Sequence, residues 1–309
     1  MKAMVCTGYG PPEVLQLREV PKPDPADDEV LIRVRATAVT ASDIFIRSSE
    51  LPLRYRIPMR LMIGITKPRR SIIGEVLAGE IECVGKSIRR FAVGDRVCGM
   101  TGFSLGAYAE YKCMKETDSK QGCLAHMASN IGYEAATVAA YGGALALQYL
   151  QRGHLEPGRK VLIYGASGTC GTTAIQLAKH RGAEVTGVCG TSHLELVKQL
   201  GADFVIDYTK EDSLDSAARF DLVLDAVGRA KSSKLKDACK RALTPAGKYV
   251  SIDDGALELV SARLEQLKEL IEAGHVRPVV DRCYPFERMA DAHEYVGRGH
   301  KAGGVAITV

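Results

Sequence analysis

The chain of 309 residues lacks any long apolar run, and no stretch approaches the roughly 18–20 apolar residues that a membrane-spanning helix needs. A dense basic segment is also absent, because 41 basic and 37 acidic residues leave a net charge of only +4. The most basic stretch, residues 67–70, is interpreted as a solvated loop, with contact to an anion or a partner as the alternative. We therefore expect no nucleic-acid and no membrane partner. The N-terminus does not resemble a signal peptide, which favours a cytoplasmic protein.

Clustered metal ligands and disulfide patterns are missing as well. Nine cysteines are scattered singly, without a Cys-x-x-Cys pair, and seven histidines contain no i,i+4 pair. An odd number of dispersed cysteines is typical of reduced thiols in the cytoplasm. Tetrahedral zinc sites need soft ligands at close spacing, so we expect no metal. No Ser-His-Asp elbow, paired-carboxylate motif or Walker loop suggests another chemistry.

What the sequence does contain is enough for two folded domains. Apolar residues make up 46% and charged residues 25%, as in ordinary globular proteins. Up to about residue 124, short strands broken by Gly and Pro indicate a compact β-rich barrel. Its clearest expected strands are residues 30–36, 81–85 and 95–99.

From about residue 125 to 256 the pattern changes to alternating strands and helices. Such alternation predicts βαβ units and a parallel sheet. The expected strands are residues 161–164, 184–189, 204–206, 221–225 and 248–252. The expected helices are residues 172–180 and 194–200. An amphipathic helix at 261–273 and an apolar strand at 305–309 follow.

A buried strand ending at Tyr164 leads into three glycines and directly into a helix. Glycine allows a tight turn and the close approach of a pyrophosphate, whose charge the helix N-terminus stabilises. Between a strand and a helix of a βαβ series, this spacing predicts a dinucleotide site rather than a merely structural turn. The expected cofactor-binding residues here are Gly165, Ala166, Ser167, Gly168, Thr169, Cys170 and Gly171. For Cys170, a redox-sensitive thiol and a tolerated small residue are both considered.

The end of the next strand indicates which dinucleotide binds. NAD sites place an acidic residue about 20 residues beyond the glycines, where this chain has none before Glu195. Hydroxyl groups can hydrogen-bond a 2′-phosphate, and a lysine can add charge. We therefore predict NADPH, with a site that accepts either NADPH or NADH as the alternative. The residues expected to contribute are Gly190, Thr191, Ser192 and Lys198.

Several segments resemble the zinc-free quinone oxidoreductase branch of the medium-chain dehydrogenase/reductases. They are residues 10–15, 91–97, 106–111 and 166–208. The resemblance implies an α/β protein, with a GroES-like β-rich catalytic domain (residues 1–124 with 257–309) and a Rossmann doubly wound parallel-sheet domain (125–256), the active site between them, and a homodimer. It also implies cofactor contacts at Tyr141, Tyr208, Ala226, Val227 and Gly228. The family often has Thr where this chain has Ala144, so one cofactor contact differs.

Zinc-dependent relatives carry Cys three residues before Asp, and then Gly-His-Glu. This chain has Thr40 and Asp43, and then Gly74-Glu75-Val76. Without a Lewis acid, we expect hydride transfer to a small molecule that accepts it readily, a quinone or an α,β-unsaturated carbonyl compound. Thr40, Ser42 and Tyr55 are the expected hydrogen-bond donors and Asp43 orients its neighbours; a structural role is the alternative for each. An NADPH-binding redox sensor or structural protein, and a metal-free alcohol or aldehyde dehydrogenase, stay open.

Overall fold

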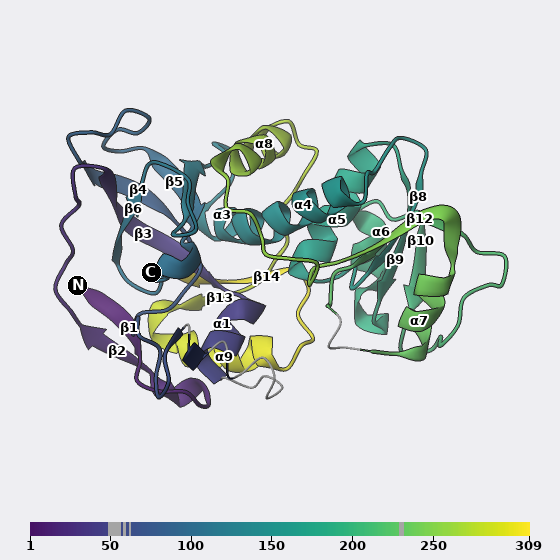
Figure 1. The fold of residues 1–309 in the computed structure, drawn as a ribbon, viewed down its shortest axis with the longest axis horizontal. Coiled ribbons are helices and arrows are strands. Elements are labelled where there is room, and N and C mark those ends of the chain that lie inside the picture. Colours follow the sequence, from purple (N-terminus) through teal and green to yellow (C-terminus); the bar gives the residue numbers. More distant parts are fainter. Residues whose placement is uncertain (49–56, 58–59, 62, 229–231) are drawn as a thin grey trace. The chain divides into compact units, whose positions relative to one another are not determined.

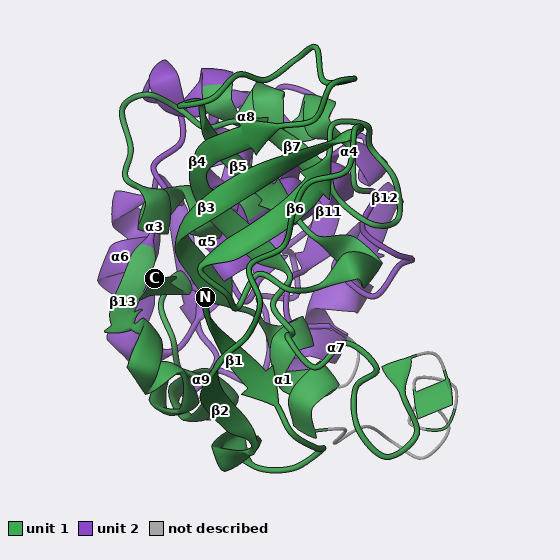
Figure 2. Cartoon of the chain, turned by 90° about the vertical axis from the view of Figure 1, so that its left-hand side faces the viewer, with its two compact units in different colours: residues 1–140, 259–268, 280–309 green, residues 141–258, 269–279 purple. Residues whose placement is uncertain are grey.

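The computed structural model describes residues 1–48, 57, 60–61, 63–228 and 232–309. The described residues form two compact units, which Figure 2 colours separately. Unit 1 comprises Met1–Ala140, Leu259–Lys268 and Val280–Val309, and unit 2 comprises Tyr141–Glu258 and Glu269–Val279. The predicted domain boundaries, at residues 124 and 256, stay a prediction.

Unit 1 is built on a seven-stranded sheet with the order β13-β14-β3-β4-β5-β7, in which β6 also pairs with β3. A separate antiparallel pair joins β1 to β2. The long central strand β3 has Val30, Ile32 and Val34 buried on one face, as its alternating sequence predicts. The strands are β1 (Lys2–Cys6), β2 (Leu15–Glu19), β3 (Glu29–Val39), β4 (Val76–Val84), β5 (Arg96–Met100), β6 (Tyr111–Lys115), β7 (Cys123–His126), β13 (Val280–Pro285) and β14 (Gly304–Thr308).

The helices of unit 1 whose bounds lie within the described residues include α1 (Ala41–Ser48), α3 (Tyr133–Val138) and α9 (Met289–Gly297). Helix α1 follows β3 immediately, and it packs against α9. An apolar core lies between these helices and the sheet, with Ile46, Met289 and Ile307 among its buried residues. This packing therefore holds α1, and with it the residues that follow Val39, in a fixed position.

Unit 2 contains a parallel sheet of five strands with the order β10-β9-β8-β11-β12. Figure 1 labels β8, β9, β10 and β12 of this sheet. The strands are β8 (Lys160–Tyr164), β9 (Glu184–Cys189), β10 (Phe204–Asp207), β11 (Phe220–Asp225) and β12 (Leu243–Ser251). The helices are α4 (Ala144–Arg152), α5 (Thr169–His180), α6 (Leu194–Gln199) and α7 (Lys234–Arg241). The expected α/β fold with a Rossmann sheet is thus confirmed. The strand order reverses at β8, so the carboxyl ends of β8 and β11 form the switch point at which such sheets bind ligands.

Helix α8 (Ser261–Glu272) begins in unit 1 and ends in unit 2. The segment after it returns to α5, where the side chain of Gln176 hydrogen-bonds both backbone groups of Arg277, at 3.0 and 2.8 Å. Val276 beside it is buried. Residues 269–279 are therefore part of the support of α5. None of the helices in the described ranges has the length and apolarity to cross a membrane.

Candidate functional site

The predicted glycine loop lies at the switch point of unit 2. It connects β8 to α5, and the strand beside it, β11, pairs Asp225 with Tyr164. Gly168 precedes the first residue of α5, with no side chain capping the helix. The first amides of this helix are therefore left for another partner, at the edge where we predict that a dinucleotide's phosphates bind.

Two of the three glycines are required by the fold itself. Gly165 has a φ of +86°, and a Cβ there would lie 2.5 Å from Cγ1 of Val227. A Cβ on Gly171 would lie 2.2 Å from the carbonyl oxygen of Gly165. Gly165 thus allows the turn and Gly171 allows α5 to approach β8, as the motif predicts.

Gly168 is different, because nothing in the folded chain demands a glycine there. Its φ is −78°, and a Cβ would meet only the Gly165 carbonyl oxygen, at an ordinary 3.5 Å. The space beside Gly168 is therefore left open toward the exposed side of the helix start. A cradle of bare amides that a methyl group would fill fits a pyrophosphate.

The remaining loop residues divide into two groups. Ala166 and Cys170 are buried, so only their backbone can reach a ligand, whereas Ser167 and Thr169 are partly exposed. Tyr141 lies in a π-helical turn, Ala139–Gly143, where Gly142 lets the chain approach Thr169. Such turns are frequent at functional sites. Their cofactor contacts stay predictions.

An acidic residue that we did not predict, Asp207, lies beside the end of β9. Asp207 ends β10, in register with Cys189, and its buried carboxylate accepts hydrogen bonds from the hydroxyls of Thr191 (2.5 Å) and Thr209 (2.7 Å). The Thr191 bond is the main cause that lowers the pKa of Asp207. Since a hydroxyl has one proton, Thr191 presents only lone pairs outward. Asp207 could have been anticipated, because parallel strands end at the same edge.

Other groups at this edge retain protons for a 2′-phosphate. Ser192 and Lys198 are exposed, and Tyr208 is 47% exposed. Gly190 makes room for Tyr208, since a Cβ on Gly190 would lie 3.4 Å from the tyrosine hydroxyl oxygen. Ser192 and Tyr208 thus keep exposed hydroxyl protons, whereas the Thr191 proton is donated to Asp207; contacts of these residues with a cofactor stay predictions.

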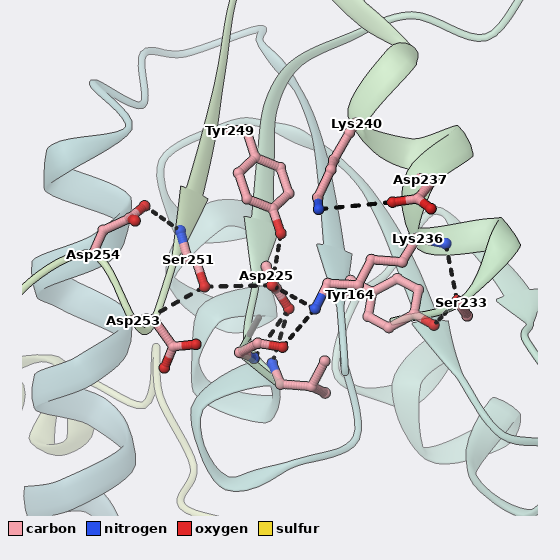
Figure 3. Close-up of polar contacts among 12 residues, drawn as sticks. Tyr164, Asp225, Ser233, Lys236, Asp237, Lys240, Tyr249, Ser251, Asp253 and Asp254 are labelled. Atoms are coloured by element: carbon pink, nitrogen blue, oxygen red, sulfur yellow. Dashed lines mark hydrogen bonds and ion pairs between the residues drawn. The ribbon is translucent and has the colours of Figure 1, made fainter. Parts of the chain in front are cut away.

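A buried ion pair between Asp225, at the end of β11, and Lys236 lies next to the predicted Ala226-Val227-Gly228 segment; Figure 3 shows the pair. Lys236 Nζ lies 2.7 Å from Asp225 Oδ2, and the two side chains are 2% and 0% exposed. Lys236 also donates to the Gly228 carbonyl oxygen at 2.6 Å. The other donors to the Asp225 carboxylate are the amides of Val227 and Gly228 and the hydroxyls of Tyr249 and Ser251.

This arrangement fixes the segment after β11 against the glycine loop. Ser233 caps α7 by accepting the Lys236 amide at 3.0 Å, and its hydroxyl contacts that of Tyr164 at 2.9 Å. Figure 3 shows α7 presenting Lys236 toward the carboxylate. Val227 lies against the glycine loop, since a Cβ on Gly165 would touch it. The ion pair between Lys236 and Asp225 therefore holds in place one side of the predicted phosphate site.

In unit 1, the predicted residues Thr40, between β3 and α1, and Asp43, in the first turn of α1, are both buried. Asp43 Oδ2 accepts hydrogen bonds from the Thr40 amide (2.9 Å) and hydroxyl (2.8 Å). The Thr40 hydroxyl oxygen also lies 3.4 Å from Glu75 Oε2, and Ser42 hydrogen-bonds the Glu75 carboxyl. The structure therefore brings together Thr40, Ser42 and Asp43 and adds Glu75, which we did not predict.

Burial, together with the nearby charge of Asp43, raises the pKa of Glu75 to about 8. Burial likewise raises the pKa of Asp43 to about 6, against hydrogen bonds from Thr40 that lower it. The carboxyls of the buried Asp43 and the half-buried Glu75 lie close together and cannot both ionise easily. This region therefore holds a proton near neutral pH.

A second buried pair lies beside the carboxyls. Tyr108 and His293 are 3.0 Å apart, hydroxyl oxygen to Nε2, and both side chains are fully buried. Burial lowers the pKa of His293 to about 3, with a further contribution from Arg47. His293 is therefore neutral at ordinary pH. Tyr55, the remaining predicted donor, lies outside the described residues.

Comparisons with known proteins can be set beside this geometry. Residues 26–146 match the family described as the alcohol dehydrogenase GroES-like domain, and residues 169–283 match the zinc-binding dehydrogenase family. A chloroplastic NADPH-dependent alkenal/one oxidoreductase of Arabidopsis thaliana is 32% identical, over 99% of this chain and 79% of that protein. The chain belongs to the quinone oxidoreductase branch of the medium-chain dehydrogenase/reductases.

Two further matches, one by sequence and one by structure, cover nearly all of the chain. A quinone oxidoreductase of Pseudomonas aeruginosa is 28% identical, with 99% of each chain covered. A mycobacterial structure complexed with NADPH has a TM-score of 0.81 and 24% identity, with 100% of each chain covered, and so shows the same fold. The family prediction from the sequence is confirmed, and with it the assignment as an oxidoreductase.

The family description as zinc-binding does not identify metal ligands in this chain. Within the ranges that the structure describes, no three His, Cys, Asp or Glu side chains gather as ligands. The cluster in unit 1 supplies two carboxyls and hydroxyls, which differs from the soft ligand sets of zinc sites. The chemistry these groups can perform is hydrogen bonding and proton transfer.

Proposed function

We propose that this oxidoreductase uses NADPH to reduce quinones or α,β-unsaturated carbonyl compounds without zinc. The observation that carries the proposal is the open space beside Gly168. The fold itself does not require glycine at this position, whereas the close approach of a phosphate does. The related alkenal/one and quinone oxidoreductases support the substrate class.

The glycine loop and the start of α5 would hold the pyrophosphate, and the segment after β11 would line the nicotinamide. Ser192 and Tyr208 would donate to the 2′-phosphate, with Lys198 adding charge. The negative charge of the buried Asp207 repels a 2′-phosphate bound nearby. We therefore expect the protein to prefer NADPH but still to accept NADH. The bound cofactor supplies a hydride.

Thr40, Ser42 and Asp43 would contribute to the substrate site of unit 1. The Ser42 hydroxyl can donate to an oxygen on which charge develops, while Asp43 holds Thr40 in place. Substrates that already accept hydride need less polarisation than simple ketones, which agrees with a site that contains hydroxyls and carboxyls.

The test is NADPH oxidation with 1,4-benzoquinone, an alkenal and a simple aldehyde, each with and without a chelator. We expect turnover of the first two, unchanged by the chelator. Tight NADPH binding without turnover would instead indicate a sensor or structural protein. Turnover restricted to the aldehyde would indicate an alcohol or aldehyde dehydrogenase, and loss of activity on chelation would refute zinc independence.

The cytoplasmic location and the homodimer also stay proposals. Strand β12 lies at one edge of the sheet in unit 2, and edge strands can pair with a second copy of the chain. Solution scattering that gave a monomer mass would refute the dimer.

A further inference from the structure

Thr40 and Glu75 stand where zinc-dependent relatives carry cysteine and histidine. In this chain the two side chains meet beside Asp43, with the Thr40 hydroxyl oxygen 2.8 Å from Asp43 Oδ2 and 3.4 Å from Glu75 Oε2. The place of a metal is thus taken by a hydroxyl between two carboxyls. What such a group can do depends on where its protons lie.

The hydrogen bonds of Thr40 indicate which carboxyl carries a proton. A hydroxyl has one proton and two lone pairs. Thr40 donates its proton to Asp43 and accepts the Asp43 amide at 3.1 Å on one lone pair. Its contact with Glu75 can therefore be a hydrogen bond only if Glu75 donates, through a protonated carboxyl. The order of donation is then from Glu75 to Thr40 to Asp43.

The surroundings favour the same arrangement. Asp43 is fully buried, and its carboxylate accepts hydrogen bonds from Thr40, from the Tyr108 hydroxyl and from the Glu75 amide. A buried carboxylate with these donors stays ionised more easily than a second carboxyl close by. The neighbouring titratable and charged groups are Arg47 on α1, the buried Tyr108 and the neutral His293 on α9. Glu75 itself is partly exposed, which lets it exchange protons with solvent or substrate.

We infer that Glu75 is the proton donor of the reduction and that Asp43, acting through Thr40, is its positioning residue. A Brønsted acid thereby replaces the Lewis acid of the zinc-dependent relatives. This inference rests on the proposed function. It concerns how the same site completes the reaction.

The step balances for an α,β-unsaturated ketone. Hydride addition at the β-carbon breaks the C=C π bond and leaves an enolate, while NADPH becomes NADP⁺. The Glu75 carboxyl transfers its proton to the enolate α-carbon and becomes a carboxylate. Solvent then returns one proton to Glu75, so the sum is reduction of the C=C bond of the enone to a saturated ketone by NADPH and one proton.

The test compares Glu75→Gln and Asp43→Asn with Glu82→Gln, a control on the exposed end of β4. We expect Glu75→Gln to lower kcat about 100-fold or more, as for loss of a general acid, and to remove the fall in kcat above about pH 8. Asp43→Asn should move that fall to lower pH, because it removes the charge that raises the pKa of Glu75. Glu82→Gln should change neither property.

A second measurement does not depend on turnover or on variants that fold. Infrared spectra of the cofactor-free protein with isotope-labelled glutamate should show a protonated carboxyl at pH 7. Absence of that band, or unchanged kcat and pH profile in Glu75→Gln, would overturn the inference. A wild-type protein that reduces no quinone or enone would instead refute the proposed function, whatever the spectrum shows.

Discussion

Replacing Lys236 with methionine should destabilise the protein far more than replacing an exposed lysine on the same helix. At 2.7 Å from Asp225, the attraction between the two charges is about 6 kcal/mol for an effective dielectric constant of ~20. Desolvation offsets part of this attraction in the intact pair. Loss of Lys236 leaves the Asp225 charge buried without its counter-charge, although its other hydrogen bonds remain, and such a loss costs about 3–5 kcal/mol. Domains have a total stability of only about 5–15 kcal/mol.

The assay is urea unfolding followed by circular dichroism, with Lys240→Met as the matched control. Lys240 is 41% exposed and pairs with Asp237 at 3.8 Å, so its loss should cost about 0–1 kcal/mol. Asp225→Asn combined with Lys236→Met removes both charges and should cost less than the sum of the single changes, with a coupling of about 2 kcal/mol. The reasoning fails if Lys236→Met lies within about 1 kcal/mol of the control.

Three further predictions concern the cradle, the coenzyme and the buried histidine. Gly168→Ala should leave the free energy of unfolding unchanged but weaken NADPH binding about tenfold or more. The control Gly158→Ala, at a φ of +76° in open space, should cost about 1–2 kcal/mol of stability and leave NADPH binding intact. Both affinities are measured by titration of NADPH fluorescence, and equal affinities would contradict a phosphate cradle. Ser192→Ala should weaken NADPH binding about tenfold or more, through loss of a hydrogen bond to a charged group, without changing the Kd of NADH; equal losses for both coenzymes would exclude a 2′-phosphate contact. Because the pKa of His293 falls from 6.5 to about 3 on folding, the unfolded chain binds a proton that the folded chain does not, so stability should fall from about pH 6.5 toward pH 3; His293→Gln should flatten this dependence in urea titrations, and an unchanged slope would refute the assignment.

The loop of unit 2 could be predicted because its signal is local. A strand, glycines at set spacing and a helix are adjacent in the sequence, and each glycine has a separate physical reason. The alternation of strands and helices likewise predicted the parallel sheet. It did not predict that β12 begins before residue 248, at Leu243.

The groups that were missed depend on pairings between distant segments. Asp207 meets Thr191 only through the register of β10 with β9, and Glu75 meets Thr40 only because β4 pairs with β3. Two weak signals existed. Glu75 interrupts an apolar run, and Lys236 falls among the buried residues Leu235 and Cys239 of α7. An ionisable residue on an apolar face indicates a buried partner, but the sequence does not say which one.

The return of the chain to α5 after α8 has a practical consequence for anyone dissecting this enzyme. A gene fragment that stops at Glu258 would encode all five strands of the parallel sheet but omit the peptide that carries Val276 and Arg277. Gln176 would then lose two hydrogen bonds, and part of α5 would be stripped of its cover. Adding residues 269–279 back, as a separate peptide or by splicing, should be necessary for the excised nucleotide-binding half to fold and bind.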